Sequence, residues 1–251
     1  YMPEYEDESS RSFVVDSWYN KSFWLYLLYP FSILFSYLTS RRRRKFLKNK
    51  TESFSTKIPI IVVGNLTIGG TGKTPLVKYI ATELIKRGYK PGIVSRGYGG
   101  KFKETLKVDS NTSVKQTGDE AQILSKLNIP FYIDKNRVRA VEKIIENHDC
   151  DVIISDDGLQ HYKMKRDIEI AVIDGKRRFG NKLTFPAGPL RESIKRLSTV
   201  DFVVNNSGPT EENEFLMSIS PSEFVHLKSG KSYSVEDWPM HNQVHAVAGL
   251  G

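Results

Sequence analysis

Residues 58–78 read IPIIVVGNLTIGGTGKTPLVK and predict a buried strand, a glycine-rich turn and the start of an amphipathic helix. Residues 60–63 are branched and apolar, as in a strand of a parallel sheet, and Pro59 stands at the strand start, where a missing N–H does little harm. Pro75 falls in the first turn of the expected helix, a position that suits proline. This stretch therefore predicts the strand, loop and helix of a phosphate-binding unit.

The order of residues in the turn is the one that a nucleotide-phosphate site needs. Glycines let the backbone curl so that successive N–H groups point inward, and the helix N-terminus adds partial positive charge. We expect Lys73 to reach the β- and γ-phosphates of ATP and the Thr74 hydroxyl to ligate Mg²⁺. The strict pattern G-x-x-x-x-G-K-[ST] has glycine where this chain has Thr67, and a chance GKT after a strand is the alternative. The residues expected to hold the nucleotide are Thr67, Gly69, Gly70, Thr71, Gly72, Lys73 and Thr74.

Composition sets further bounds on the 251-residue chain. Its one cysteine, Cys150, excludes a disulfide framework and a thiolate metal cluster, and a reducing compartment fits. The formal net charge is +8, but residues 41–48 read RRRRKFLK without an acid and account for most of the excess. The basic character is therefore a local patch.

That patch follows residues 23–38, FWLYLLYPFSILFSYL, which carry no charge. A spanning helix needs about 20 residues, and Pro30 interrupts this stretch, so we interpret residues 1–48 as an acidic tail and a membrane-associated helical segment. Trp and Tyr favour the lipid headgroup level, and each nearby arginine contributes about 1 kcal/mol of attraction to anionic lipid. The segment lies in the interface, re-enters it or spans marginally. The alternative is a buried helical hairpin with a solvated arginine run.

Downstream, apolar runs alternate with helical patterns, which implies right-handed crossovers and a mostly parallel sheet covered on both faces. We therefore predict an α/β, P-loop NTPase-like domain over residues 49–207. Residues 208–251 form the start of a smaller C-terminal region, and HAVAGLG at its end suggests that further sequence follows. Strands are expected at residues 91–95, 131–133, 151–155, 168–174, 200–205, 224–227 and 244–248, and helices at 76–87, 116–126 and 137–147.

Ligands of such sheets bind outside the carboxyl ends of the strands, where this chain has two adjacent acids. Residues 152–157 read VIISDD, so we expect Asp156 to ligate Mg²⁺ and Asp157 to act beside it. A solvated acidic pair at a strand end is the alternative. His161 follows in GLQH, where ordering the loop and contacting substrate are equally open.

Three other loops carry polar residues that folding alone does not require. Arg96 in SRGYGG suits a second anionic group, although a tight surface turn explains it as well. Asp119 in GDE either caps a helix or accepts a proton from a substrate hydroxyl. Arg191 and Glu192 in PAGPLRE are either a positioned ion-capable pair or a charged helix start.

Five segments, taken in order, resemble the tetraacyldisaccharide 4′-kinase (lipid A 4′-kinase) family: VVGNLTIGGTGKTP, SRGYGG, TGDE, DDGLQH and PAGPLRE. Thr67 in place of the glycine of the strict phosphate-loop pattern also suits this family. The resemblance covers residues 59–205, with a weaker echo in HAVAGLG. It implies a kinase that moves the γ-phosphoryl of ATP to the 4′-hydroxyl of a tetraacylated glucosamine disaccharide 1-phosphate, a lipid A precursor. It also implies attachment to the cytoplasmic face of a bacterial inner membrane, where the lipid substrate resides.

The resemblance implies roles residue by residue. The phosphate-loop lysine falls on Lys73, the Mg²⁺-ligating hydroxyl on Thr74 and the candidate base on Asp119. The acidic pair falls on Asp156 and Asp157. Positions matched with looser phosphate and substrate contacts are Arg96, His161, Arg191 and Glu192. The family also pairs its base with a later histidine, which neither His241 nor His245 matches.

Two other classes of protein share part of this pattern. A membrane-associated P-loop switch or partitioning ATPase acting on a protein partner shares the phosphate loop and the basic anchor, but it gives no reason for DDGLQH, GDE and PAGPLRE together. A nucleic-acid-dependent ATPase requires stimulation by polynucleotide that falls with salt. Because the aromatic residues form a block and do not interleave with the cations, we predict no nucleic-acid partner, and no obligate protein partner is evident.

Overall fold

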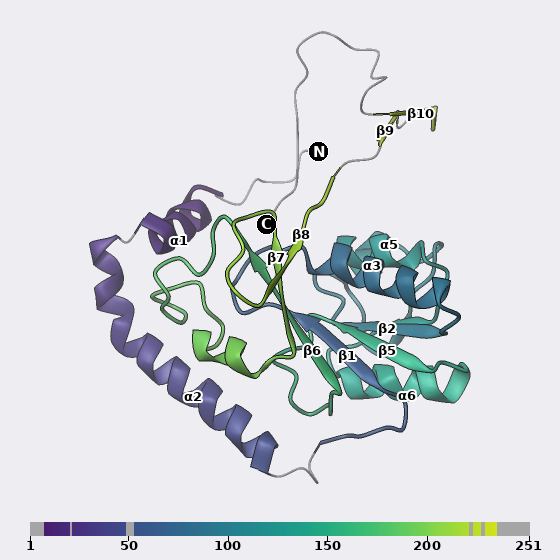
Figure 1. Cartoon of the computed structure of the whole chain (residues 1–251), viewed down its shortest axis with the longest axis horizontal. Coiled ribbons are helices and arrows are strands. Elements are labelled where there is room, and N and C mark those ends of the chain that lie inside the picture. Colours follow the sequence, from purple (N-terminus) through teal and green to yellow (C-terminus); the bar gives the residue numbers. More distant parts are fainter. Residues whose placement is uncertain (1–7, 21, 49–52, 221–222, 227–228, 235–251) are drawn as a thin grey trace.

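The computed structural model describes residues 8–20, 22–48, 53–220, 223–226 and 229–234. Its centre is an eight-stranded sheet in the order β3-β4-β2-β5-β1-β6-β7-β8 (Figure 1). The strands are β1 Ile60–Gly64, β2 Pro91–Ser95, β3 Leu106–Lys107, β4 Phe131–Ile133, β5 Val152–Asp156, β6 Ile168–Asp174, β7 Phe202–Asn206 and β8 Glu214–Met217. Neighbouring strands are parallel except β3, which runs antiparallel to β4 at one edge. The predicted mostly parallel α/β sheet is confirmed.

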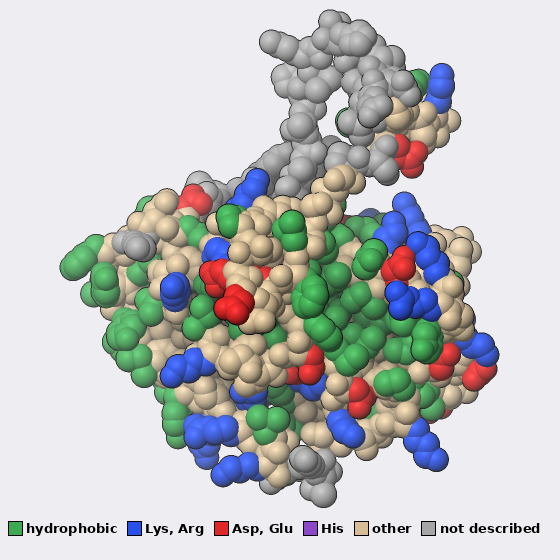
Figure 2. All heavy atoms as spheres, in the orientation of Figure 1, with side chains coloured by type: hydrophobic (Ala, Val, Ile, Leu, Met, Phe, Trp, Pro, Cys, Tyr) green, Lys and Arg blue, Asp and Glu red, His purple; other side chains and the backbone are tan. Residues whose placement is uncertain are grey.

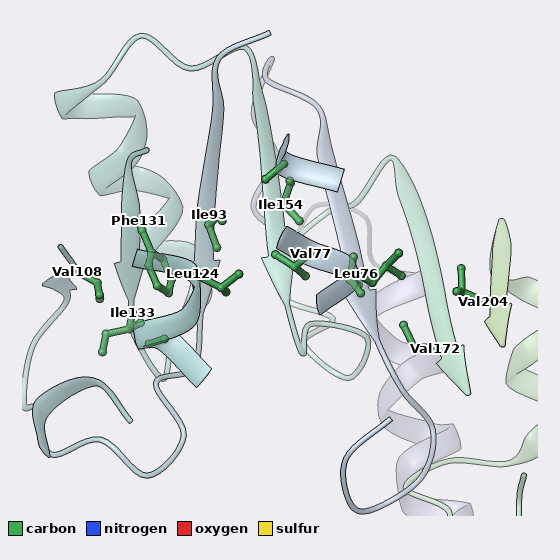
Figure 3. Close-up of a cluster of buried hydrophobic side chains, with 13 residues drawn as sticks. Leu76, Val77, Ile93, Val108, Leu124, Phe131, Ile133, Ile154, Val172 and Val204 are labelled. Carbon is green, nitrogen blue, oxygen red and sulfur yellow. The ribbon is translucent and has the colours of Figure 1, made fainter. Parts of the chain in front are cut away.

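Helices cover the sheet from both sides, with α3 and α5 on one face and α6 on the other (Figure 1). The body helices are α3 Lys73–Lys86, α4 Val114–Thr117, α5 Asp119–Ser125, α6 Arg137–Asn147 and the 3₁₀ helix η3 Ile194–Thr199. Successive residues of a strand point to opposite faces, so Val63 packs with α3 and α5, whereas Val62 packs with α6. Figure 3 shows the first of these clusters, in which Leu76 and Val77 of α3 lie over strand residues such as Ile154.

Strand β8 extends the sheet beyond residue 207 and pairs in parallel with β7. The separate hairpin of β9 Glu223–Val225 and β10 Ser232–Ser234 contains part of the strand expected at 224–227. The strand expected at 244–248 lies outside the described residues. The division of the chain into domains at residues 48 and 207 stays a prediction.

The N-terminal segment lies on the outside of the domain and comprises α1 Glu8–Asn20, the 3₁₀ helix η1 Phe23–Leu28 and α2 Tyr29–Lys48. Pro30 falls in the first turn of α2, directly after the junction with η1, where its missing N–H is tolerated. Large apolar side chains of this segment are exposed to solvent: Phe23 is 86% and Phe31 is 61% exposed. The alternative of a buried helical hairpin is therefore not what the structure shows.

The amphipathic face of α6 gives a test of the sheet core. Ile144 is fully buried against the sheet, whereas its neighbour Ile145 is 39% exposed. We expect Ile144→Ala to lower the free energy of unfolding by about 2–5 kcal/mol because it leaves a cavity. The control Ile145→Ala should cost about 1 kcal/mol or less, and both are measured by urea denaturation. Equal losses in the two variants would contradict this packing.

Candidate active site

Three side chains donate hydrogen bonds to the backbone of the phosphate loop between β1 and α3. The backbone carbonyls of Gly69, Gly70 and Thr71 accept hydrogen bonds from Asn65 Nδ2 (3.2 Å), Arg177 Nη2 (2.5 Å) and Asn206 Nδ2 (3.2 Å), respectively. Gly72 has a φ of +89°, and a Cβ there would lie 2.6 Å from Asn206 Nδ2. Three consecutive carbonyl oxygens of the loop are thus bound by protein side chains, which fits a phosphate-binding curl whose N–H groups serve the ligand.

Lys73, at the start of α3, faces the end of β5. Its Nζ lies 3.7 Å from Asp157 Oδ1, and Arg191 Nη1 donates to both oxygens of the same carboxylate at 3.0 and 3.2 Å. The guanidinium of Arg137 donates to the Asp157 carbonyl oxygen at 3.0 Å. Burial alone raises the pKa of Asp157, but Lys73, Arg191 and Arg137 outweigh burial and hold that pKa below its usual range. Asp157 is therefore a carboxylate surrounded by cations.

Asp156 is the buried last residue of β5, and neither of its carboxylate oxygens has a hydrogen-bond partner among the described residues. Burial raises its pKa to about 7, Lys73 opposes that rise, and Glu120 adds to it. An orphaned buried carboxylate beside a phosphate loop fits a hard cation such as Mg²⁺. Thr74 is likewise buried in the first turn of α3.

No cluster of three or more His, Cys, Asp or Glu side chains with metal-binding geometry occurs in the described part of the chain. Mg²⁺ in nucleotide sites is commonly held by one or two protein oxygens together with phosphate oxygens and water. Thr74 and Asp156 therefore fit a cation that arrives with the nucleotide better than one held by protein alone.

The SRGYGG and TGDE loops touch each other at the same edge of the sheet. A Cβ on Gly118 would lie 2.0 Å from Tyr98 O, and one on Gly100 would lie 2.3 Å from Gln116 O. Gly118 is the N-cap of α5, so Asp119 is its exposed first residue and does not fill the capping role. The influence of Glu120 on Asp156 places this end of α5 within electrostatic range of the β5 carboxylate.

Arg96, in the same loop pair, is exposed near Arg137. Burial lowers the pKa of Arg137 to about 10, Asp157 opposes this effect, and Arg96 adds to it. Both guanidinium groups therefore lie on the Asp157 side of the site. A second anionic group bound beside the nucleotide would meet this positive charge.

His161 and Glu192 are less exposed to solvent than Arg96 and Asp119. Burial, together with Arg137 and Arg166, lowers the pKa of His161 to about 4, and its Nε2 is buried without a partner among the described atoms. The Glu192 side chain is buried, accepts a 2.6 Å hydrogen bond from Tyr162 Oη and lies 3.8 Å from Arg196 Nε. This placement does not support the expected substrate contact of Glu192.

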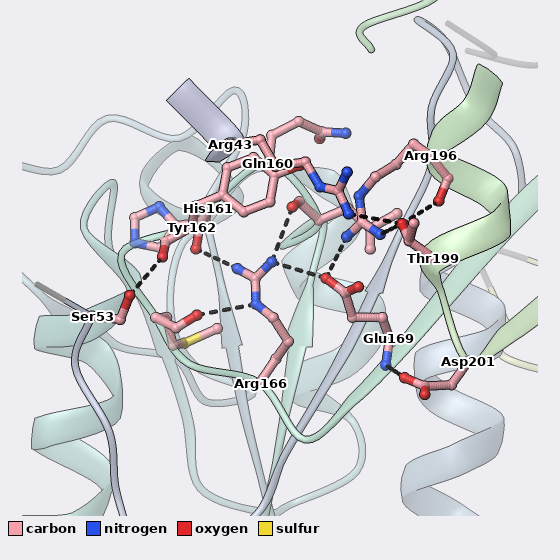
Figure 4. Close-up of polar contacts among 12 residues, drawn as sticks. Arg43, Ser53, Gln160, His161, Tyr162, Arg166, Glu169, Arg196, Thr199 and Asp201 are labelled. Carbon is pink, nitrogen blue, oxygen red and sulfur yellow. Dashed lines mark hydrogen bonds and ion pairs between the residues drawn. The ribbon is translucent and has the colours of Figure 1, made fainter. Parts of the chain in front are cut away.

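Glu192 borders a polar network centred on Glu169 of β6 (Figure 4). Glu169 accepts from Arg166 at 2.9 Å and from Arg196 at 2.5 Å, and Arg166 also donates to the carbonyl oxygen of His161 at 2.6 Å. Figure 4 shows Arg43 of α2 reaching the same cluster, where it donates to Thr199 Oγ1 at 2.9 Å. This network therefore fixes the loop that carries His161.

Sequence reasoning missed four residues that shape the site, namely Asn65, Arg137, Arg177 and Asn206. Arg137 was counted only as part of an amphipathic helix, and Asn206 followed the last residue of a predicted strand. Their positions just beyond strand ends, or at a helix start, are the signal that could have identified them.

This protein is a P-loop nucleoside-triphosphate-binding enzyme, because a glycine-rich phosphate loop follows strand β1 and its Lys73 lies beside the acidic end of β5. The chain belongs to the tetraacyldisaccharide-1-P 4′-kinase family, whose model matches residues 24–251. The resemblance drawn from the five motifs is thereby confirmed, and the chain belongs to a family of kinases.

Curated relatives carry the same name. The tetraacyldisaccharide 4′-kinase of Shewanella denitrificans is 44% identical over 235 residues, which is 93% of this chain and 71% of that protein. That of Vibrio campbellii is 42% identical over 227 residues, or 90% and 67% of the two chains. A solved structure of LpxK from Aquifex aeolicus, described as in complex with ATP, has a TM-score of 0.68 at 30% identity and covers 77% of this chain and 64% of that one. The chain thus spans about two thirds of its relatives' length.

The low pKa of His161 gives a pH test. Because the folded pKa of about 4 lies below the ordinary 6.5, His161 favours folding above pH 6.5, and this contribution is lost as pH falls towards 4. We expect His161→Gln, which cannot take up the proton, to lose less unfolding free energy than the wild type over that interval. Urea denaturation of both proteins at several pH values measures the difference. Parallel pH profiles would show that His161 is not held neutral.

Proposed function

We propose that this chain carries the ATP-binding and phosphoryl-transfer site of a lipid kinase that phosphorylates the 4′-hydroxyl of a tetraacylated glucosamine disaccharide 1-phosphate. The observation that carries the proposal is that Lys73 Nζ, at the end of the phosphate loop, lies 3.7 Å from the carboxylate of Asp157, the residue directly after β5. It is supported by the names of the relatives and by the ATP described with the Aquifex structure. A switch or partitioning ATPase leaves the loops around Asp157 unexplained.

The geometry suits in-line transfer with little covalent participation by the protein. Lys73 and the amides of the phosphate loop would bind the β- and γ-phosphates, and Arg191 would orient Asp157 beside them. Exposed Asp119 would orient the acceptor hydroxyl and take its proton as the O–P bond forms and ADP leaves. Mg²⁺, held by Thr74 and Asp156, would supply neutralisation of phosphate charge.

The N-terminal segment suits attachment to the cytoplasmic face of an inner membrane. Large apolar side chains of η1 and α2 are exposed, among them Leu27 (78%), Leu34 (55%) and Leu38 (51%). Figure 2 shows hydrophobic groups along the edge formed by α1 and α2, with lysine and arginine side chains gathered below them. By length and composition alone, the helical stretch Phe23–Lys48 could cross a bilayer, because an 18-residue window within it has a mean hydropathy of 1.2. An interfacial position agrees better with the contacts that α2 makes with the domain.

Replacing the phosphate-loop lysine tests the reaction directly. We expect Lys73→Ala to reduce transfer of labelled phosphate from ATP to the acylated disaccharide by at least about a hundredfold, because one charged transition-state contact is lost. Lys78→Ala, on the exposed side of the same helix, is the matched control and should keep its activity. Label that appears only as free phosphate in the wild type would support the switch ATPase.

The base assignment needs a separate test. Asp119→Ala should lower kcat by about two to four orders of magnitude while ATP affinity stays within about twofold, because a general base acts on the acceptor and not on the nucleotide. Steady-state kinetics and equilibrium ATP binding separate the two effects. A comparable loss of ATP binding would assign Asp119 to the nucleotide site instead.

If α2 attaches the protein to the membrane, negative charges on its exposed face should weaken binding to lipid vesicles. The double variant Phe31→Glu, Leu34→Glu should bind vesicles containing anionic lipid at least about tenfold more weakly, because two apolar side chains leave the interface. Tyr79→Glu on α3 is the control, because the Tyr79 side chain is 63% exposed, as Phe31 is 61%. Cosedimentation at low and high salt measures the effect. Unchanged binding of the double variant would exclude α2 as the attachment site.

A further inference from the structure

The anchor helix α2 turns a polar seam towards the domain and its apolar residues outward. Ser32, Ser36 and Ser40 recur every four residues along one side of the helix and line a cavity of about 460 Å³ shared with the segment around Thr184. Ser32 is only 3% exposed, whereas its neighbours Phe31 and Ile33 are 61% and 56% exposed. A buried hydroxyl in an otherwise apolar helix calls for specific partners.

Those partners all lie in the segment of residues 184–191, here called the bridging loop. Ser32 Oγ donates to Thr184 O at 2.7 Å, and Thr184 Oγ1 donates back to Ser32 O at 2.9 Å. The Ala187 N–H donates to Ser32 Oγ at 2.8 Å, so the hydroxyl both donates and accepts. The N-terminal segment adds a hydrogen bond from Trp18 Nε1 to Pro186 O at 3.0 Å.

The other end of the bridging loop is fastened to the nucleotide site. Ile68 N, in the phosphate loop, donates to Pro189 O at 2.8 Å, and Arg191 N donates to Leu66 O at 2.7 Å. The Arg191 side chain then binds Asp157, the carboxylate that faces Lys73. One short segment therefore contacts both the anchor helix and the phosphate loop.

Internal hydrogen bonds stiffen the bridging loop. Phe185 N donates to Leu190 O at 2.8 Å, and Gly188 N donates to Thr184 O at 3.1 Å. Leu190 is fully buried, and Asn181 Nδ2 donates to Ala187 O at 2.7 Å. A segment tied in this way transmits a displacement at Thr184 to Arg191 instead of absorbing it.

We propose that Ser32 is a positioning residue for ATP, which acts through the bridging loop to hold the phosphate loop and Arg191 in place. The inference rests on the proposed nucleotide site and extends it to a residue of the anchor helix, far from the phosphates in sequence. The N-terminal segment is then part of the nucleotide site as well as a membrane contact.

The test is equilibrium binding of ATP with Mg²⁺ by the whole chain in detergent micelles. Ser32→Ala should weaken ATP binding about tenfold at a temperature well below its unfolding transition. Ser36→Ala is the matched control, because it lies one turn further along the same seam and is only partly exposed; its affinity should stay within twofold. Thr184→Val should weaken ATP binding about as much as Ser32→Ala does. Thr184→Ser keeps the hydroxyl and should therefore bind ATP as the wild type does.

Thermal unfolding of each variant separates positioning from stability. A lower unfolding temperature with unchanged ATP affinity in both Ser32→Ala and Thr184→Val would show that the hydroxyl pair only stabilises the fold, and would overturn the inference. If Ser32→Ala does not fold, the comparison of Thr184→Val with Thr184→Ser decides. A wild-type chain that does not bind ATP overturns the proposed function and this inference together, whereas wild-type binding with unchanged variants overturns the inference alone.

Discussion

The ion pair between Lys73 and Asp157 is the contact on which the site depends. It joins the first turn of α3 to the end of β5, and Arg191 and Arg137 bring two further segments to the same residue. Asp157 also has a φ of +49°, a left-handed conformation that aspartate adopts more often than most residues other than glycine. Since the Asp157 side chain is only 25% exposed, each cation around it compensates a charge that would otherwise be costly to bury. The fold thereby concentrates positive charge beside the phosphate loop.

A second carboxylate behaves differently although it is the next residue in the chain. Asp156 points into the domain without a hydrogen-bond partner among the described residues, and burial favours its neutral form. The two adjacent acids thus differ in their surroundings: Asp157 pairs with Lys73 and Arg191, whereas Asp156 is buried and unpartnered among the described residues. A cation arriving with the nucleotide would reverse the preference of Asp156 for a proton.

Most strands of the sheet could be predicted because they are short apolar runs, and β1, β5 and β6 end in a glycine or an aspartate. Strand β8 was missed because only seven residues, 207–213, connect it to β7, without a crossover helix. The grouping of Lys73, Asp156 and Asp157 followed from the rule that ligands lie at strand ends. Arg191 and Glu192 show where sequence reasoning stops: as consecutive residues they point apart, one to Asp157 and the other to Tyr162. Nor does a local pattern show that Arg137 reaches a carbonyl 20 positions away.

The outward apolar face of the N-terminal helices invites their removal to make the protein easier to handle in water. The hydrogen bonds of Ser32 and Trp18 show that such a deletion is not neutral. It would strip partners from Thr184, Pro186 and Ala187, and uncover the ring of Phe185, which packs on Trp18 and Phe35. A shortened chain that loses nucleotide binding would therefore say little about lipid dependence, and single substitutions on the outer face are the cleaner way to separate solubility from catalysis.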